Sequence, residues 1–154
     1  MNNRSDVPGY GYPLVHGATT LMEDWQAIQS LGNNHCMLGH LLGWFYSGLG
    51  GIRAAKDAIA FNKIEIHPQV VGDISYTKGH VSVALWFNKK SEWQKKKNTF
   101  ELNVVIPVNT TADIYLPLKA GAIVFKNCQP IKADRVLHTG SGNYKFIVRS
   151  AETE

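Results

Sequence analysis

The chain has 154 residues, of which 44% are hydrophobic and 18% are charged, with 14 glycines and 6 prolines. This composition fits a folded chain of about one domain, and it excludes intrinsic disorder and a collagen-like or low-complexity polypeptide. The formal net charge of +4 is too small to argue for a polyanionic partner. No stretch approaches the roughly 18–20 consecutive apolar residues of a bilayer-spanning helix, so we expect no membrane protein.

The termini, cysteines and local motifs add little about location or cofactors. Residues 1–6 lack the apolar segment of a secretory signal, so a periplasmic and a cytoplasmic location both stay open. Cys36 and Cys128 lie far apart and fit no zinc-ligand spacing, which predicts two reduced, buried thiols and no metal site. Because we find no phosphate loop and no Ser/His/Asp order above chance, we expect no cofactor.

A first helix is predicted over about residues 20–31. Thr20 and Glu23 have the three-residue spacing of a capping box, and apolar residues then follow at helical spacing until Gly32. A carboxylate in the first turn of a helix is held in its ionised form, which suits a general base. The alternative is purely structural, with the Glu23 carboxylate hydrogen-bonded to the backbone N–H of Thr20.

A second helix is predicted over about residues 35–49, where Gly50 and Gly51 end it. Apolar residues lie on nearly every side of this helix, so we expect it to be surrounded by protein. We assign Trp44, Phe45 and Tyr46 to the core.

The periodicity changes to two from about residue 62 onward. Apolar and polar residues alternate there in short runs that are separated by turns rich in glycine, asparagine and proline, which predicts seven or eight strands. The charge changes as well. Residues 1–61 carry three cationic and four anionic side chains, whereas residues 62–154 carry thirteen cationic and eight anionic side chains. The expected fold class is α+β, with an N-terminal helical segment followed by an antiparallel β-sandwich. The strands are expected at 64–66, 74–76, 81–87, 100–106, 112–116, 122–125, 135–138 and 144–149.

Five motifs follow one another in order along the chain. They are Gly17-Ala-Thr-Thr-Leu-Met-Glu23-Asp-Trp25, Asn33-Asn34-His35-Cys-Met-Leu-Gly39, Trp44-Phe45-Tyr46 with Leu49-Gly50-Gly51-Ile52, Ile64-Glu-Ile66-His-Pro68 with Gly72-Asp73-Ile74, and the run Phe100 to Pro117. Together they resemble the bacterial α-L-rhamnosidases. The first three resemble the end of the catalytic (α/α)₆ barrel of that family, and the last two resemble its C-terminal β-sandwich. The resemblance runs from about Gly9 to Pro117, and more weakly to the end of the chain.

The resemblance implies a division of the chain and an activity. Residues 1–61 would be the last helices of an incomplete (α/α)₆ barrel, and residues 62–154 the C-terminal β-sandwich. The implied reaction is hydrolysis of terminal α-L-rhamnosyl bonds with inversion, on a rhamnose-containing oligosaccharide or glycoside. Glu23 takes the position of the family's general base, His35 that of a sugar-contacting histidine, and Trp25 could line the sugar pocket.

Each of these roles has a structural alternative. His35 could be a helix-start histidine that hydrogen-bonds a neighbouring carbonyl, and Trp25 could be barrel packing. Two departures from the family pattern stand out. Met22 takes the place of a larger residue, which would loosen the pocket wall, and residues 81–88 lack the expected turn, which affects the hairpin register.

The family places its general acid on an earlier barrel loop rich in Asp, Glu and Arg, and this chain has no such loop. We therefore expect a fragment of an α-L-rhamnosidase that is inactive by itself, and that either self-associates or needs a complementing barrel chain. The alternative is a stand-alone carbohydrate-binding β-sandwich that uses exposed Trp86 and Trp93.

A nucleic-acid site would require the basic cluster between residues 89 and 97, interleaved with aromatic residues. We interpret this cluster as a solvated hairpin loop and expect no nucleic-acid partner.

Overall fold

The computed structural model describes residues 4–6, 9–25, 35–36, 39–59, 61–83 and 87–150. The chain separates into two compact units, residues 1–43 and 44–154. None of the helices in these described ranges is long and apolar enough to cross a membrane.

The first unit contains one short helix, α1 (Gly11–Val15). The N–H groups of His16 and Gly17 donate hydrogen bonds to carbonyls of the helix and close its last turn, and Gly17 has the left-handed φ of +77° that ends a helix. The predicted helix over 20–31 is wrong for residues 20–25, which form bends, and the rest of it lies outside the described residues. The Leu21 carbonyl accepts a hydrogen bond from the His35 N–H at 3.0 Å, so this acceptor serves a residue distant in sequence.

The second predicted helix begins later than expected. Residues 35 and 36 are irregular, and α2 (His40–Trp44) continues into a π-helical turn, η3 (Phe45–Leu49), which closes with a hydrogen bond from the Gly50 N–H to the Phe45 carbonyl at 2.8 Å. The expected burial is wrong for most of this segment. Trp44 and Tyr46 are 37% and 44% exposed, and only Gly48 and Leu49 are buried.

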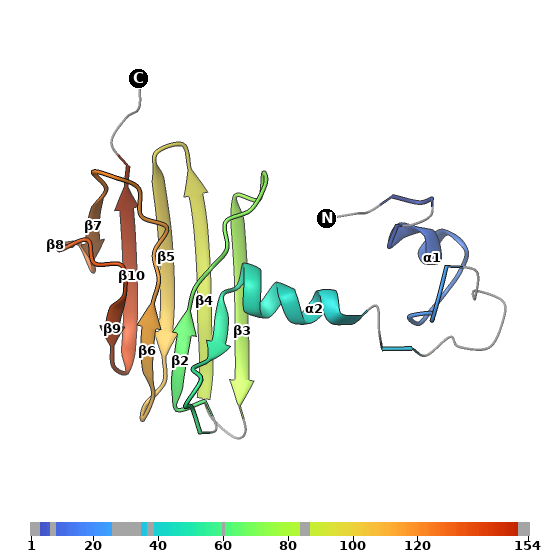
Figure 1. The fold of residues 1–154 in the computed structure, drawn as a ribbon, viewed down its shortest axis with the longest axis horizontal. Coiled ribbons are helices and arrows are strands. Elements are labelled where there is room, and N and C mark those ends of the chain that lie inside the picture. The colour runs from blue at the N-terminus through green and yellow to red at the C-terminus, as the bar shows by residue number, and fades with distance from the viewer. Residues whose placement is uncertain are drawn as a thin grey trace. The chain divides into compact units, whose positions relative to one another are not determined.

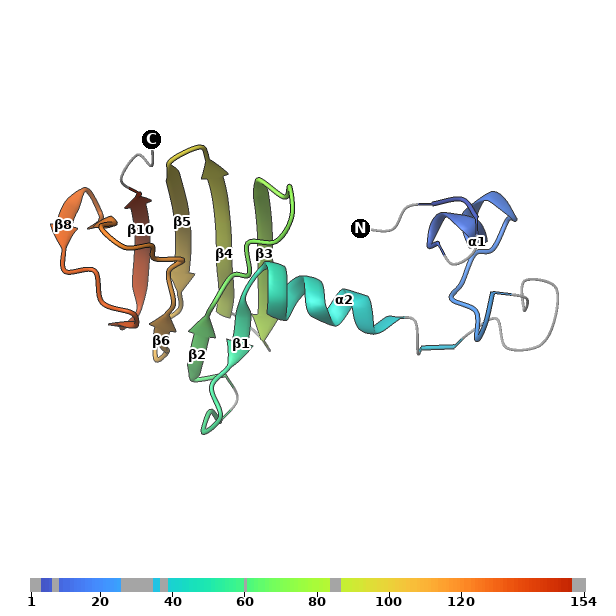
Figure 2. The same cartoon turned by 45° about the horizontal axis from the view of Figure 1, so that its top comes forward.

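The second unit is a sandwich of two sheets (Figures 1 and 2). The smaller sheet has the strand order β1-β2-β6-β9 and the larger has β3-β4-β5-β10-β7-β8. The strands are β1 (Ile52–Ala54), β2 (Lys63–Ile66), β3 (Tyr76–Val83), β4 (Phe87–Lys96), β5 (Thr99–Ile106), β6 (Thr111–Ile114), β7 (Ile123–Lys126), β8 (Gln129–Ile131), β9 (Leu137–Thr139) and β10 (Gly142–Arg149).

Nearly all strand pairs are antiparallel, as the alternation predicted. The exception is β2 with β6, which are parallel, with Ile64 opposite Ala112. Three strands of the other sheet separate these two in sequence, and such a long connection allows a parallel pair. Strand β1 pairs with β2, so the sheet begins before residue 61, where the change of periodicity was placed.

The core is formed by buried side chains from both sheets. Strand β5 shows the cause most simply, because its residues alternate between buried and half-buried along all eight positions. Inward residues of both sheets meet in one cluster, which includes Ile64, Ile66 and Ile114 from the smaller sheet and Trp93, Leu102 and Phe146 from the larger.

Strand β4 differs most from the sequence prediction. The basic cluster was interpreted as a solvated loop, but residues 87–96 form the longest strand, and Lys89 is only 2% exposed. The predicted strand 81–87 is the end of β3 and the start of β4, with Val83 opposite Phe87, so the hairpin register is defined. The cysteines are also corrected, since Cys36 and Cys128 are free but exposed.

Candidate functional site

The predicted site residues lie in the first unit, on the irregular segment that follows α1. Glu23 is exposed and Trp25 is half-buried. Met22, the residue directly before Glu23, is only 1% exposed. Met22 is therefore a packing residue of this segment. Residues 20–25 are not helical, so within the described part of the chain Glu23 does not lie in the first turn of a helix as the capping box predicted.

Two contacts fix the conformation of this segment. The rings of Tyr10 and Trp25 form an edge-to-face contact, with their centroids 6.2 Å apart and their planes at 87°. The His35 N–H donates to the Leu21 carbonyl, as described above. The second contact brings His35 beside the stretch that carries Glu23 and Trp25, although ten residues separate His35 from Trp25 in sequence.

A hollow of about 390 Å³ lies beside the same segment. Its walls come from α1 and from the stretch before Glu23, and they include Tyr10, Leu14 and Leu21. Leu14 is 73% exposed, so an apolar wall is open to solvent here. Glu23, Trp25 and His35 do not line this hollow. The described structure thus gathers the three predicted residues in one region without enclosing them in a common pocket.

Sequence reasoning missed one contributor, Tyr10. It lies fifteen residues before Trp25 and belongs to no motif that we recognised, yet it contacts the Trp25 ring and lines the hollow. Its only signal in the sequence is its place at the start of the resembling region. Among the described residues, no group of three or more His, Cys, Asp and Glu side chains is placed to hold a metal ion.

Of the two tryptophans expected to form an exposed sugar-binding surface on the sandwich, only Trp93 lies in the described part of the chain. Trp93 is fully buried, and its Nε1–H donates to the Leu49 carbonyl at 2.7 Å. This corrects its assignment as an exposed binding residue, both for a carbohydrate module and for a nucleic-acid site. Trp86 lies outside the described residues.

Comparisons with known proteins agree on one family. Residues 51–127 match the bacterial alpha-L-rhamnosidase C-terminal domain, and residues 1–49 match the bacterial alpha-L-rhamnosidase 6 hairpin glycosidase domain. Among curated proteins, the chain is 27% identical to an alpha-L-rhamnosidase of Streptomyces avermitilis and 26% identical to one of Alteromonas sp.. These matches cover 92% and 94% of this chain, but only 15% and 17% of the relatives.

Solved structures give the same result. The alpha-L-rhamnosidase of Dictyoglumus thermophilum superposes with a TM-score of 0.83 at 30% identity, over 97% of this chain and 18% of that enzyme. The alpha-L-rhamnosidase of Streptomyces avermitilis, solved with L-rhamnose, has the same fold, with a TM-score of 0.76 at 23% identity over 97% of this chain and 16% of that enzyme. The chain therefore belongs to the bacterial α-L-rhamnosidases, and it carries residues of both the six-hairpin glycosidase domain and the C-terminal domain of that family.

Proposed function

We propose that this chain takes part in the hydrolysis of terminal α-L-rhamnosyl bonds with inversion, with Glu23 as the general base. The observation that carries the proposal is the contact of His35 with the Leu21 carbonyl, because it brings the two sugar-site motifs together in the fold. The chain spans only 15–18% of the length of the relatives that it matches, so the activity is proposed for an assembly with the rest of a barrel.

In the proposed reaction, the Glu23 carboxylate removes a proton from the attacking water. A protonated carboxyl group on the opposite side of the sugar then protonates the leaving oxygen. An inverting pair needs about 6.5–9.5 Å between its carboxyl groups, so that water fits between base and anomeric carbon. This chain has no match to the acid-bearing loop, so the second group would come from the rest of the barrel. The exposure of Glu23 agrees with a site that other parts of a barrel complete.

His35 and Trp25 are proposed to contact the rhamnose. A histidine donates or accepts hydrogen bonds at sugar hydroxyls, and an indole face packs against the C–H groups of a pyranose ring. The half-buried state of Trp25 and its edge contact with Tyr10 leave part of its ring for such packing.

The division of the chain is part of the same proposal. We propose that the helical segment, expected over residues 1–61, completes a catalytic barrel and that the sandwich, expected over 62–154, supports it. The proposal is supported by two family matches that cover residues 1–49 and 51–127, and by the change of charge and periodicity near residue 61.

Two enzyme assays test this function. The 154-residue chain alone should release no measurable p-nitrophenol from p-nitrophenyl α-L-rhamnoside. A chimera in which the chain replaces the matching segment of the Dictyoglumus thermophilum enzyme should hydrolyse it. In the chimera, Glu23→Gln should lower kcat by about 10²- to 10⁴-fold, as expected for a general base.

Asp24→Asn is the matched control, because it removes a neighbouring carboxylate that has no proposed role in the reaction. An Asp24→Asn loss as large as the Glu23→Gln loss would contradict the assignment of the base. Robust turnover by the isolated chain would refute the need for a complementing barrel.

A rhamnose titration separates this function from a stand-alone binding module. In the chimera, His35→Ala should weaken rhamnose binding, whereas Trp86→Ala should not. The opposite result would favour the binding module, in which the sandwich alone holds the sugar.

A further inference from the structure

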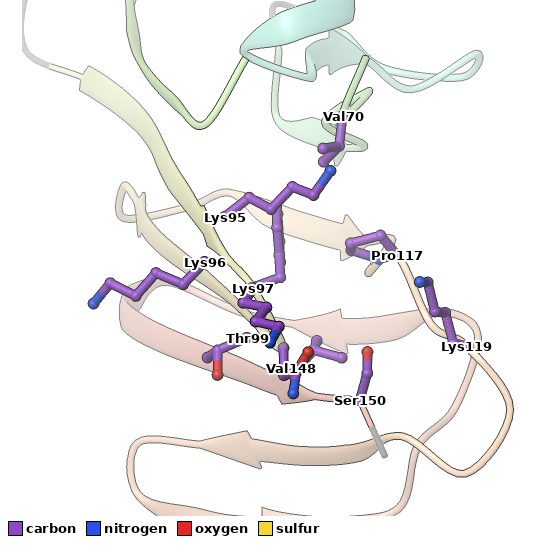
Figure 3. Close-up of a pocket in the computed structure, with 11 residues that line it drawn as sticks. Val70, Lys95, Lys96, Lys97, Thr99, Pro117, Lys119, Val148 and Ser150 are labelled. Carbon is purple, nitrogen blue, oxygen red and sulfur yellow. The ribbon is translucent and has the colours of Figure 1, made fainter. Parts of the chain in front are cut away.

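A pocket lined by lysines lies in the second unit, far along the chain from the predicted sugar site. It has a volume of about 250 Å³. The β4–β5 hairpin and the last residues of β10 form part of its wall (Figure 3). Residues from two loops of the smaller sheet complete it, Val70 after β2 and Pro117 and Lys119 after β6. Four segments that are distant in sequence thus form one concave surface.

The charge of this pocket is cationic. Lys95, Lys96, Lys97 and Lys119 line it, and no described lining residue carries a carboxylate. Lys96 forms an ion pair with Glu101 at 3.5 Å, and its side chain points away from Lys95 and Lys119 (Figure 3). Lys95, Lys97 and Lys119 form no ion pair with any residue in the described part of the chain. Three like charges in one hollow repel each other, and a bound anion would relieve that repulsion.

Both apolar and polar residues line the pocket between the lysines, with Val70 and Pro117 among the apolar ones and Thr99 and Ser150 among the polar ones. Pro117 is exposed and Val70 is half-buried, and both face the pocket from the loop side (Figure 3). Apolar C–H surfaces beside cationic groups match a sugar ring that carries an acidic substituent. The volume lies below the roughly 300–1,000 Å³ of pockets for drug-sized ligands, which limits the occupant to about one ring.

We propose that this pocket binds an acidic sugar residue of a polysaccharide through its carboxylate. Lys95, Lys97 and Lys119 supply the charge, and Val70 and Pro117 contact the ring. The inference deepens the proposed function, on which its choice of a saccharide rests, by adding an anchoring site for acidic chains that is formed by the second unit alone.

The test is a calorimetric titration of the whole chain with tetragalacturonic acid at low salt. The probe contains no rhamnose, so its binding is independent of Glu23 and His35, and a failure of the proposed hydrolysis does not change it. The methyl ester of the same tetrasaccharide, which lacks the charge, should bind at least tenfold more weakly. Raising the salt to about 0.5 M should also weaken tetragalacturonate binding, because exposed charges are screened.

Lys97→Gln and Lys119→Gln should each weaken the binding of tetragalacturonate by about two- to fivefold, the range for exposed charge pairs. Lys56→Gln is the matched control, since it removes the same charge from an exposed lysine outside the pocket and should leave the affinity unchanged. If Lys56→Gln weakened tetragalacturonate binding equally, the effect would come from the net charge of the protein, and the proposed site would be overturned.

Two further titrations identify the source of the anion. Inorganic sulfate and an eight-residue oligothymidylate should both bind more weakly than tetragalacturonate. Tighter binding of sulfate would point to a free inorganic ion, and tighter binding of the oligonucleotide would point to a nucleic acid. Either result, or no binding of tetragalacturonate, would overturn the proposal.

Discussion

Lys89 is a charged residue within the inner face of the larger sheet. It is 2% exposed, and its ammonium nitrogen lies 5.4 Å from the centre of the Phe61 ring. The next inward residue of β4, Ser91, is fully buried, and its hydroxyl has no hydrogen-bond partner in the described structure. The cation–π contact offsets part of the desolvation, but burial still lowers the pKa of Lys89.

Lys89→Met should stabilise the protein at pH 7 by about 1 kcal/mol, because it replaces a desolvated charge with an apolar chain of similar length. The sign of the pH effect follows from the lowered pKa. Between the folded-state pKa and the ordinary value near 10.5, the unfolded chain holds a proton that the folded chain releases, so wild-type stability rises with pH. In urea denaturation, the gain in free energy of unfolding of Lys89→Met over the wild type should therefore become smaller as the pH rises toward 10.

The control for this prediction is Lys78→Met on the neighbouring strand. Lys78 is exposed, so its replacement should change the free energy of unfolding by less than about 0.5 kcal/mol. A wild type that is more stable than Lys89→Met at neutral pH would show that the Phe61 contact outweighs the cost of burial.

Gly51 connects η3 to β1 in a conformation that requires glycine. Its φ is +71°, and a Cβ atom there would lie 2.3 Å from the backbone nitrogen of Pro68. Gly51→Ala should lower the free energy of unfolding by at least about 3 kcal/mol, because strain and a backbone clash combine. Gly72 has a φ of +56° with open space around it, so Gly72→Ala should cost only about 1–2 kcal/mol. If urea denaturation showed the same loss of stability for Gly51→Ala and Gly72→Ala, the predicted clash with the Pro68 backbone would be contradicted.

At the scale of elements, one hydrogen bond joins η3 to the larger sheet. The Trp93 indole donates to the Leu49 carbonyl at the end of η3, and the Trp93 ring lies 5.8 Å from that of Phe100 on β5. The π-helical turn thus ends on a core residue of the sandwich. Both residues belong to the second unit, so this bond ties the π-helical turn to strand β4 within that unit.

Trp93→Phe should lower the free energy of unfolding by about 1–3 kcal/mol, because it leaves the buried Leu49 carbonyl without its donor. Tyr76→Phe also removes one aromatic donor, which in this case bonds Glu92 at 3.0 Å, but Tyr76 is 49% exposed. Tyr76→Phe should lower the free energy of unfolding by less than about 0.5 kcal/mol in the same chemical denaturation, since water replaces the Tyr76 hydroxyl as the donor to Glu92. A Trp93→Phe protein as stable as the Tyr76→Phe protein would mean that the bond contributes nothing.

Strands β4 and β5 show why the sequence predicted some elements and missed others. Strand β5 alternates apolar and polar residues without interruption, so its period of two is visible in the sequence. Strand β4 alternates between buried and half-buried residues from Lys89 to Trp93, but two of the three buried residues there are Lys89 and Ser91. Its strand conformation comes from pairing with β3 and β5 on both sides, with Trp93 opposite Leu102. The short strands β1 and β8 were missed for a related reason, since three residues carry too little pattern.

At the scale of the whole molecule, the helical segment leaves apolar side chains in solvent. Leu42, Trp44 and Tyr46 are 60%, 37% and 44% exposed on α2 and η3. Monomeric proteins rarely expose such neighbouring apolar groups, and they mark surfaces that another chain or domain covers. We therefore keep the prediction that the isolated chain self-associates or binds the missing part of a barrel.

Sedimentation velocity should show association that increases with protein concentration, together with strong binding of a hydrophobic dye. Leu42→Gln should weaken the association constant by about tenfold, because it removes one apolar side chain from the covered surface. Ile59 is 78% exposed in the loop between β1 and β2, and Ile59→Gln should leave association unchanged. A monodisperse monomer with little dye binding would contradict this prediction.

The candidate site was also only partly visible in the sequence. The motifs gave Glu23, Trp25 and His35, because each lies in a short pattern that the family shares. Tyr10 and the lysine pocket were not predictable in this way. Tyr10 approaches Trp25 only through the turn that follows α1. Lys119 approaches the β4–β5 hairpin only because two sheets stack and bring their loops to one edge.

The amino-acid sequence by itself determined the class of the fold, the family and the order of its motifs, because alternation, turn residues and short motifs are local properties of the chain. The tertiary structure alone decided that Lys89 is buried, that residues 20–25 form bends where a helix was predicted, and which lysines line one pocket. These outcomes depend on contacts between residues far apart in sequence, and the free energy of such a contact appears only when both partners are in place.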